Sequence, residues 1–379
     1  MTKRWIIAGG GTGGHVTPAL ALGEAIAERG DEILFVGSSH GLESRLVPEA
    51  GFRLELMPSE QFMGRNLPGR LRGGVSILRS VGTARGILRR FRADAVLSVG
   101  GYAAMPTALA AWMARCPLFL VEPNAIPGRV NRLTARLARI VFVGFEATRD
   151  ALPSGTRSVC LGVPLRRALR RAFAGERKTE LPGSPLRILV FGGSQGSRQL
   201  NEVVPEALSR LARNAVEVFH QTGEADRESV AKRYAELGIP AEITAFERDM
   251  PGRYAWADLA ICRAGALTIA ELALAGMPAL LVPYPFAADD HQTANARALE
   301  EAGAARCLDP RPLDPTALAQ AIAELIASPG RLVLMREAAA RLARPDAANA
   351  IVEHCRTDLD PRSAGPVATP EEAPSCSND

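Results

Sequence analysis

The sequence predicts an α/β protein of two domains, each a doubly wound parallel sheet of the Rossmann type, that face each other across a cleft. Three observations carry this prediction. The chain has 379 residues, which is more than one hydrophobic core usually serves. Short β-branched runs alternate with longer helical patterns, as in βαβ units. The alternation then restarts at Arg187, again with a strand that leads into a glycine-rich turn.

Each half contributes its own series of predicted elements. In the first half we expect strands over Trp5–Ala8, Glu32–Val36, Ala95–Val99, Leu118–Val121 and Ile140–Val143. In the second half we expect strands over Arg187–Phe191, Val216–Gln221, Leu259–Cys262 and Ala279–Val282, and helices over Pro205–Ala212 and Gly265–Ala275. Apolar residues recur with different periods in helices and strands, so the spacing of apolar residues along the sequence should distinguish the two types of element.

The domain boundaries follow from composition. A basic segment that contains glycine and proline, Arg166–Pro185, predicts a linker, so we expect domains over residues 1–163 and 164–344. Residues 357–379 contain almost no large apolar side chains and predict a disordered tail.

Composition and charge set limits on the function. Hydrophobic residues make up 47% and charged residues 23% of the chain, as in ordinary globular proteins. The net charge is only +4, yet thirteen arginines lie between Gln61 and Ile140 against two acids, Asp94 and Glu122. One face of the first half should therefore attract anions. The six cysteines form no C-x-x-C pair, which favours reduced cytosolic thiols over a zinc site or a disulfide framework.

Glycine-rich turns end several predicted strands. Five glycines occupy the six positions from Gly9 to Gly14, and His15 follows them. Ordered glycine loses much conformational entropy, so such a run implies sharp bends or a close approach to a phosphate or a sugar. The turns Gly192–Ser197 and Gly100–Gly101 also follow strands. Ligands of open parallel sheets collect at these strand ends, where helix N-termini favour anions.

A dinucleotide-binding oxidoreductase is the first alternative, because Gly9, Gly11 and Gly14 match G-x-G-x-x-G. That fingerprint also needs an acid at the end of the next strand to bind ribose. Here the strand ends in Gly37-Ser38-Ser39, which disfavours this alternative. A P-loop is disfavoured as well, since neither glycine turn is followed by Lys-Ser/Thr.

Five motifs occur in order along the chain: GGTGGHVTP (Gly10–Pro18), SVGGYAAMP (Ser98–Pro106), GGSQGS (Gly192–Ser197), the run from YAWAD to CRAGALTIAE (Tyr254–Glu271) and DHQTANA (Asp290–Ala296). Together they resemble the GT-B glycosyltransferases of family 28 that build bacterial peptidoglycan. The resemblance implies an inverting transfer of GlcNAc from UDP-GlcNAc to the 4-hydroxyl of the muramyl sugar of undecaprenyl-pyrophosphoryl-MurNAc-pentapeptide (lipid I), which gives lipid II.

The resemblance also implies what each domain binds. The first domain would face the acceptor and the membrane and would be completed by a C-terminal helix over residues 345–356. The second domain would bind UDP-GlcNAc. The expected partners are UDP-GlcNAc, lipid I and an anionic membrane surface, with no nucleic acid and no cofactor. The expected location is the cytoplasmic face of the bacterial cell membrane, where binding is peripheral because no stretch reaches ~18–20 apolar residues.

On the donor side, the resemblance implies that Glu271 accepts hydrogen bonds from both ribose hydroxyls. Arg166 would lie near the uridine, and Gln292 would reach the sugar hydroxyls. Backbone near Phe246 and Glu247 would bind uracil. The diphosphate would meet N–H groups that follow Ser194 and those of the helix that begins with Ala266, Leu267, Thr268, Ile269 and Ala270.

On the acceptor side, the resemblance places Thr12, Gly13 and Gly14 near the transferred sugar. Asn124 would contact donor or acceptor, and Glu122 is assigned with His15 to the catalytic residues. His15 stands at the start of a helix, whose dipole keeps an imidazole neutral and able to accept a proton. A capping or phosphate-orienting role for His15 stays open.

Two departures from the family pattern affect this site. The family commonly has His-Glu-Gln-Asn where this chain has Val121-Glu122-Pro123-Asn124, and Asn-Pro-x-Arg where this chain has Val163-Pro164-Leu165-Arg166. We expect no metal site, because the one Asp-x-Asp, Asp358-Leu359-Asp360, falls in the predicted tail. A UDP-GlcNAc 2-epimerase and a non-catalytic sugar-nucleotide-binding protein stay open as alternatives.

The arginine-rich part of the first half predicts a membrane-binding face. Apolar and basic residues alternate there, and Trp112 lies near Arg115, a mixture that suits an interfacial helix. The residues are Leu67, Arg70, Leu71, Arg72, Val75, Ile77, Leu78, Arg79 and Arg85. The alternative is an amphipathic helix whose apolar side faces the core.

Overall fold

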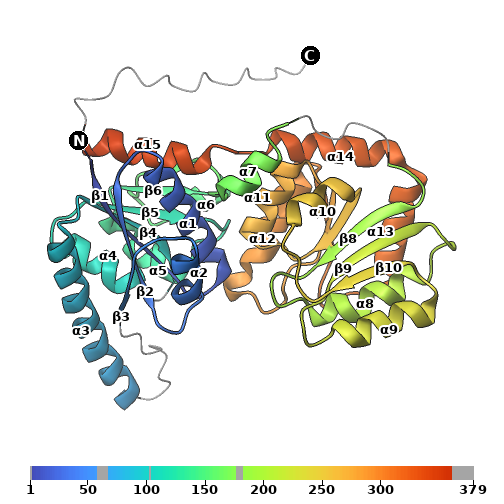
Figure 1. Cartoon of the computed structure of the whole chain (residues 1–379), viewed down its shortest axis with the longest axis horizontal. Helices are drawn as coiled ribbons and strands as arrows, with labels where there is room; N and C mark the ends of the chain where they lie inside the picture. The colour runs from blue at the N-terminus through green and yellow to red at the C-terminus, as the bar shows by residue number, and fades with distance from the viewer. Residues whose placement is uncertain (1, 58–66, 102–103, 176–181, 361–379) are drawn as a thin grey trace.

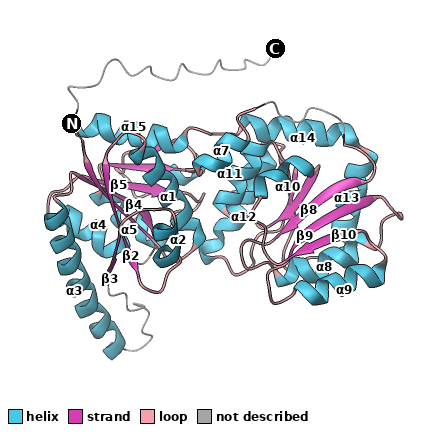
Figure 2. Ribbon diagram, viewed as in Figure 1, coloured by secondary structure: helices cyan, strands magenta, loops and turns pink. Residues whose placement is uncertain are grey.

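The computed structural model describes residues 2–57, 67–101, 104–175 and 182–360, with the backbone alone described over 67–77. Two α/β domains lie side by side (Figure 1), and helices cover the faces of each sheet (Figure 2). The first sheet has seven strands in the order β3-β2-β1-β4-β5-β6-β7, and the second has six in the order β10-β9-β8-β11-β12-β13. Neighbouring strands pair in parallel in both sheets. The predicted fold class is confirmed.

The strands of the first sheet are β1 (Arg4–Gly9), β2 (Glu32–Ser38), β3 (Leu54–Met57), β4 (Ala95–Gly100), β5 (Leu118–Glu122), β6 (Ile140–Val143) and β7 (Ser158–Cys160). Those of the second are β8 (Leu186–Phe191), β9 (Val216–Gln221), β10 (Ala241–Thr244), β11 (Leu259–Cys262), β12 (Ala279–Leu281) and β13 (Ala305–Cys307). The nine predicted strands are all present. The four that were not predicted, β3, β7, β10 and β13, are the four sheet edges, whose half-buried residues carry a weaker apolar signal.

The helices of the first domain are α1 (Gly13–Ala27), α2 (Glu43–Glu49), α3 (Leu67–Phe91), α4 (Ala104–Met113), α5 (Arg129–Thr134), η1 (Ala135–Leu137) and α6 (Ala147–Asp150). The chain continues through α7 (Arg167–Ala172), α8 (Arg198–Leu208), α9 (Arg227–Leu237), α10 (Met250–Trp256), α11 (Ala266–Ala275), η2 (Ala288–Asp290), α12 (His291–Glu301), α13 (Pro315–Ala327), α14 (Pro329–Arg341) and α15 (Ala347–Leu359).

Two predicted segments differ from the structure. The helix expected over Pro205–Ala212 begins at Arg198, because the Ser197 hydroxyl caps it by accepting the Leu200 N–H at 3.5 Å, and Pro205 lies within it. The expected linker contains a helix, since α7 occupies part of Arg166–Pro185.

The predicted tail begins too early. Helix α15 continues to Leu359. The Asp358 carboxylate forms ion pairs with Arg139 Nη1 at 2.9 Å and Arg157 Nη1 at 3.2 Å. Asp360 pairs with Lys3 at 3.0 Å. The Asp-x-Asp sequence therefore belongs to the folded first domain, where basic side chains hold it. Residues 361–379 lie outside the described residues.

Helix α15 packs against α1 on the first sheet, although the chain reaches it only after completing the second domain (Figure 1). Its buried side chains are Ala347, Ala348, Ile351, Val352 and Cys355. Four of these join Trp5, Ile7 and Phe142 in one core cluster. The apolar face of α15 thus covers part of the first sheet.

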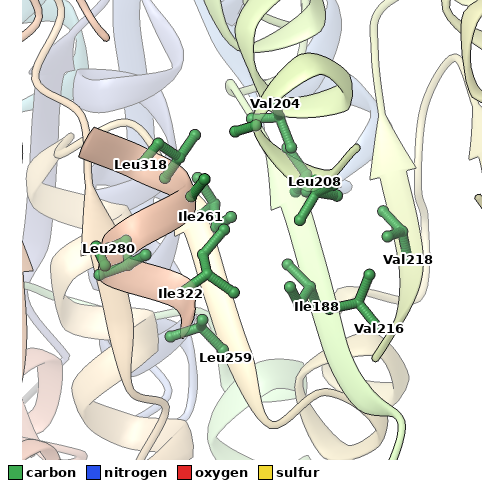
Figure 3. Packing of buried hydrophobic residues seen from close by; sticks show 14 of the residues in the cluster. Ile188, Val204, Leu208, Val216, Val218, Leu259, Ile261, Leu280, Leu318 and Ile322 are labelled. Atoms are coloured by element: carbon green, nitrogen blue, oxygen red, sulfur yellow. The ribbon is translucent and has the colours of Figure 1, made fainter. Parts of the chain in front are cut away.

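The second sheet is filled in the same manner by its own helices. In Figure 3, Leu208 of α8 lies between Val204 of the same helix and Ile188 of β8, and Ile322 of α13 lies near Ile261 of β11. These side chains are at most 2% exposed. The packing fixes where strands end and helices begin, and those ends form the candidate site.

Candidate functional site

Residues of both domains line a cavity of about 720 Å³, which we call the interdomain cavity. From the first domain come the start of α1, the turn after β4 and the turn after β5, with Thr12, Gly14, His15, Gly100, Gly101, Glu122, Asn124 and Asn131. From the second come the starts of α11 and α12, with Gly265, Ala266, His291 and Gln292. The structure therefore brings predicted acceptor-side and donor-side residues onto one cavity.

A second cavity of about 960 Å³, the glycine-loop cavity, lies against the turn Gly192–Ser197. Ser194 lines it, as predicted for a phosphate-binding turn, and so does Arg263. Thr12 and Gln292 line both cavities, so the two adjoin. A ligand that extends from the second glycine turn to α1 would pass these two residues.

The first glycine turn is held by a buried acid that sequence reasoning missed. Glu43, 1% exposed at the start of α2, accepts the Gly11 N–H at 2.8 Å through Oε2. Its Oε1 accepts both the N–H and the hydroxyl of Ser38 at 2.8 Å. The only signal in the sequence is an acid shortly after the end of β2. Because this carboxylate binds the turn itself, it is not available to a ribose, which argues against a dinucleotide site.

Close backbone contacts explain why glycine is needed in both domains. Gly101 has φ +85°, and a Cβ there would lie 2.2 Å from the carbonyl oxygen of Gly10. In the second domain, Gly196 has φ +76°, and a Cβ would lie 1.8 Å from the carbonyl oxygen of Thr222. In each domain, then, the turn after one strand packs directly on the turn after its neighbour.

His15 is half-buried in the first turn of α1, and its Nδ1 lies 3.2 Å from the Thr12 hydroxyl. Burial lowers the pKa of His15, and the nearby His291 ring lowers it further, while Glu43 acts in the opposite sense. The ring is therefore neutral at physiological pH. The sequence predicted this from the helix dipole, whereas the structure adds burial as the main cause.

Glu122 lines the interdomain cavity but is only 1% exposed. Its Oε1 accepts the backbone N–H of Asn124 at 3.0 Å and the Asn124 Nδ2 at 3.2 Å. Its Oε2 accepts the Gly128 N–H at 2.8 Å and the Asn131 Nδ2 at 2.9 Å. Burial raises the pKa of Glu122, and these hydrogen bonds oppose that rise. With four donors already bound, the carboxylate is better placed to hold this turn than to take a proton from a substrate.

The N-terminus of α11 opens into the interdomain cavity at Gly265 and Ala266. Gly265 has no side-chain cap, and the Ile269 N–H donates to the Gly265 carbonyl at 2.9 Å. Among the described residues, the N–H groups at this helix start without a partner are therefore those of Ala266, Leu267 and Thr268. Ile269 and Ala270, also predicted to bind the substrate, lie where N–H groups are used within the helix, and the Ile269 side chain is in the core.

Gln292, in the first turn of α12, holds two backbone groups near that helix start. Its Oε1 accepts the Ala264 N–H at 3.2 Å and the Tyr284 N–H at 2.9 Å. The side chain lines both cavities. Its Nε2 has no acceptor among the described residues, so both of its hydrogens can bind a ligand.

Glu271 is half-buried on α11 and accepts the Tyr254 hydroxyl at 2.9 Å. Burial raises its pKa to about 7, and the Tyr254 hydrogen bond opposes the rise. Arg253, the residue before Tyr254 in α10, donates from its Nε to Glu247 Oε2 at 2.8 Å. Burial would raise the pKa of Glu247, but hydrogen bonds from Arg253 and the Asp249 N–H outweigh it and lower that pKa. Helix α10 thus connects the predicted uracil loop to the predicted ribose carboxylate.

Arg166 does not join these residues. Its Nε donates to Glu24 of α1 at 2.6 Å, and it stands just before α7. Arg263 supplies a cation to the glycine-loop cavity, where its Nη1 donates to Gln199 Oε1 and to the carbonyl groups of Val282 and Pro283. The sequence signal for Arg263 was its place directly after β11, at a carboxyl end of the sheet.

Two family models match the chain. The glycosyltransferase family 28 N-terminal domain matches residues 5–143, and the glycosyltransferase family 28 C-terminal domain matches residues 187–351.

Relatives match over nearly the full length. The UDP-N-acetylglucosamine–N-acetylmuramyl-(pentapeptide) pyrophosphoryl-undecaprenol N-acetylglucosamine transferase of Halorhodospira halophila is 46% identical over 351 residues, covering 92% of this chain and 96% of the relative. The enzyme of the same name from Acidithiobacillus ferrooxidans is 44% identical over 356 residues, covering 94% and 98%.

Solved structures give the same picture. The crystal structure of Acinetobacter baumannii MurG is 32% identical, has a TM-score of 0.78 and covers 94% of this chain and 99% of its own. The UDP-GlcNAc 2-epimerase of Neisseria meningitidis, bound to UDP-GlcNAc, has a TM-score of 0.64 at 14% identity, covering 94% of this chain and 100% of its own. That second likeness concerns the fold alone.

Proposed function

The chain belongs to glycosyltransferase family 28, and from this membership we propose which of its residues carry the reaction. The enzyme is a hexosyltransferase that moves N-acetylglucosamine from UDP-GlcNAc to the lipid-linked muramyl-pentapeptide of lipid I, giving lipid II for peptidoglycan synthesis. One observation supports the residue assignment most strongly: His15 of the first domain and Gln292 of the second line the same cavity.

The donor binds mainly to the second domain in this proposal. Glu271 accepts hydrogen bonds from the ribose hydroxyls. The free N–H groups at the start of α11 bind the diphosphate, together with the turn at Ser194. Gln292 offers its Nε2 hydrogens to the GlcNAc hydroxyls. Arg263 stabilises the charge that develops on the departing UDP, as preorganised donors do in other transferases.

The acceptor hydroxyl approaches from the first domain. Its oxygen attacks C1 of GlcNAc as the bond from C1 to the UDP phosphate oxygen breaks, and the configuration at C1 inverts. His15 takes the hydroxyl proton, which requires the neutral ring that burial maintains. Glu122 holds the turn that presents Asn124, and Thr12 orients the His15 ring.

The test is transfer of labelled GlcNAc to a short-chain lipid I analogue. We expect a β-linked disaccharide product, UDP release in equal amount and no change on addition of EDTA. Formation of ManNAc without acceptor would instead identify an epimerase. Binding of UDP-GlcNAc without turnover would identify a sugar-nucleotide-binding protein.

We also propose that α3 and α4 dock on an anionic membrane surface. The two helices pack together, and Leu78 (73% exposed), Trp112 (56%) and Met113 (51%) are open to solvent there. Arg79 and Arg115 are exposed beside them. Apolar side chains flanked by arginines suit the interface between headgroups and acyl chains. Of the other expected residues, the side chains of Leu67, Arg70, Leu71, Arg72, Val75 and Ile77 lie outside the described residues.

Arg85 does not fit this face as expected, because it is half-buried and its Nε is enclosed. In the described part of the chain, no single helix is long and apolar enough to cross a membrane, and the pair α13 and α14, which would satisfy the length together, is bent by 98°.

A further inference from the structure

One buried amide side chain joins the two domains beside the interdomain cavity. Asn295, on α12, is 0% exposed. Its Oδ1 accepts the backbone N–H of Ala125, in the turn after β5 of the first domain, at 2.8 Å. Its Nδ2 donates to the carbonyl of Ala264 in the second domain at 3.0 Å and lies 3.3 Å from Asn124 Oδ1.

Both backbone polar groups of Ala264 are held by side chains of α12. Gln292 accepts its N–H, and Asn295, one turn further along the same helix, donates to its carbonyl. The next residue, Gly265, is the N-cap of α11, whose free N–H groups bind the diphosphate in the proposed mechanism. Both amides therefore hold the residue that precedes the N-cap of this helix, and Gln292 still holds it when Asn295 is replaced.

The first-domain side of the contact is equally constrained. Asn124 directs its Nδ2 and its backbone N–H to Glu122, which leaves its Oδ1 for Asn295. Ala125 donates to Asn295 in the same turn. The turn that faces the acceptor is thus fixed to the helix start that faces the donor through a single side chain.

We propose that Asn295 is a positioning residue that sets the distance between donor and acceptor in the cavity. This inference rests on the proposed function, because it presumes that the two substrates meet there. Only an amide meets the three contacts, since it must accept from one N–H and donate toward two acceptor oxygens. A displacement of about 1 Å between reacting groups can reduce turnover about 100-fold.

The first test replaces Asn295 by Ala and measures turnover, KM and UDP affinity. We expect kcat to fall by about 10- to 100-fold, while UDP binding measured by calorimetry changes less than threefold. Glu271, Gln292 and the start of α11 all remain in the second domain, so UDP keeps its contacts. Arg297→Ala is the matched control, because Arg297 lies on the same helix, is exposed and pairs only with Glu300 among the described residues.

The second test is a pH-dependent rescue. In Asn295→Asp, an ionised carboxylate would face the Ala264 carbonyl and Asn124 Oδ1, whereas a protonated carboxyl can donate to one of them. We expect the kcat ratio of Asn295→Asp to Asn295→Ala to rise at least fivefold from pH 8 to pH 6. The other titratable or charged groups that line the cavity are Glu122, His15, His291, Asp289 and Arg129, and all five are present in both variants, so their own titration contributes to both rates.

Three results would overturn the inference. These are a kcat for Asn295→Ala within twofold of wild type, a fall in UDP affinity that matches the fall in kcat, and a flat pH ratio. If Asn295→Ala does not fold, the kcat ratio of Asn295→Asp to wild type at pH 6 and pH 8 tests the inference instead. Wild-type transfer in the same assay tests the proposed function separately, so its failure cannot be confused with failure of the Asn295 inference.

Discussion

The hydrogen bond between Thr12 and His15 decides which ring nitrogen can accept a proton. If Nδ1 carries the hydrogen and donates to the Thr12 hydroxyl, Nε2 has a free lone pair for the acceptor hydroxyl. In the other tautomer Nε2 carries the hydrogen and cannot act as a base. The proposed mechanism therefore requires the Nδ1–H form, in which Thr12 is an acceptor.

His15→Ala should lower kcat by about 10²–10⁴, the range of a general base, while UDP affinity stays near wild type. Steady-state kinetics and calorimetry measure the two quantities. Because the pKa of His15 lies below its usual value, the wild-type rate should hold as pH falls to 6.5 and decline only at lower pH. A loss of less than tenfold would assign His15 a positioning role.

Glu271→Ala should weaken UDP and raise the KM for UDP-GlcNAc, since both lose the ribose contacts. Loss of hydrogen bonds to a charged group costs about 1.5–3 kcal/mol. That corresponds to about 10- to 150-fold in affinity. Calorimetry with UDP measures this directly, and unchanged affinity in a folded variant would contradict the assignment.

The raised pKa of Glu271 also predicts how the stability of the folded protein depends on pH. The folded protein keeps this proton up to about pH 7, whereas the unfolded chain releases it near the ordinary glutamate pKa. Stability therefore falls as pH rises through that interval, and the loss is complete above pH 7. Glu271→Gln should melt higher than wild type at pH 8, by about 2–4 °C per kcal/mol relieved, and at the same temperature at pH 4. Equal melting at pH 8 would refute the raised pKa.

At the scale of elements, the sequence located the interior of each sheet and the ends of its strands. Interior strands are largely continuous apolar runs, whereas the edge strands β3 and β13 are only half-buried and include charged residues, so their apolar signal is weaker. The same limit applies within the site. A glycine turn or an arginine after a strand is visible locally, but the pairing of Asn295 with Ala125, 170 residues apart, depends on how two domains meet.

Gly101→Ala tests the contact between the first two turns of the first domain. It combines an unfavourable backbone conformation with a collision against Gly10, so we expect a loss of about 1–3 kcal/mol in stability and at least tenfold in kcat. Gly11→Ala is the control, because Gly11 also has a positive φ, +95°, but no atom of the described residues lies within 4 Å of its Cβ position. Denaturant melts and kinetics should separate the two variants; equal losses would remove the contact as the cause.

Ile351→Ala tests whether α15 stabilises the first domain. Ile351 is 0% exposed in the core cluster shared with α1, so truncation should cost about 2–5 kcal/mol. UDP affinity should be unchanged, since the donor contacts lie in the other domain. Leu334→Ala, at a site 66% exposed on α14, should change stability by about 0.5 kcal/mol or less. An equally small effect of Ile351→Ala would show that α15 contributes little.

For the whole molecule, charge is distributed between domains in a way the net value of +4 conceals. Between Gln61 and Ile140 of the first domain, thirteen arginines face only two acids, and Arg79 and Arg115 accompany exposed apolar side chains on α3 and α4. In the proposed mechanism, the second domain carries the donor contacts. An enzyme arranged in this way can rest its first domain on a bilayer that holds the acceptor while nucleotide reaches the second domain from water.

Replacing Arg79 and Arg115 together by glutamate should therefore reduce co-sedimentation with anionic liposomes. Each arginine near an anionic surface contributes about 1 kcal/mol, so two charge reversals should weaken binding by at least about 30-fold at low salt. The difference should shrink as added salt shortens the Debye length. Turnover of membrane-embedded lipid I should slow, whereas a short-chain soluble acceptor should react as with wild type, because neither arginine lines the cavity. Arg187→Glu in the second domain is the matched control and should sediment like wild type. If the double variant also sediments like wild type at low salt, the membrane face lies elsewhere on the molecule.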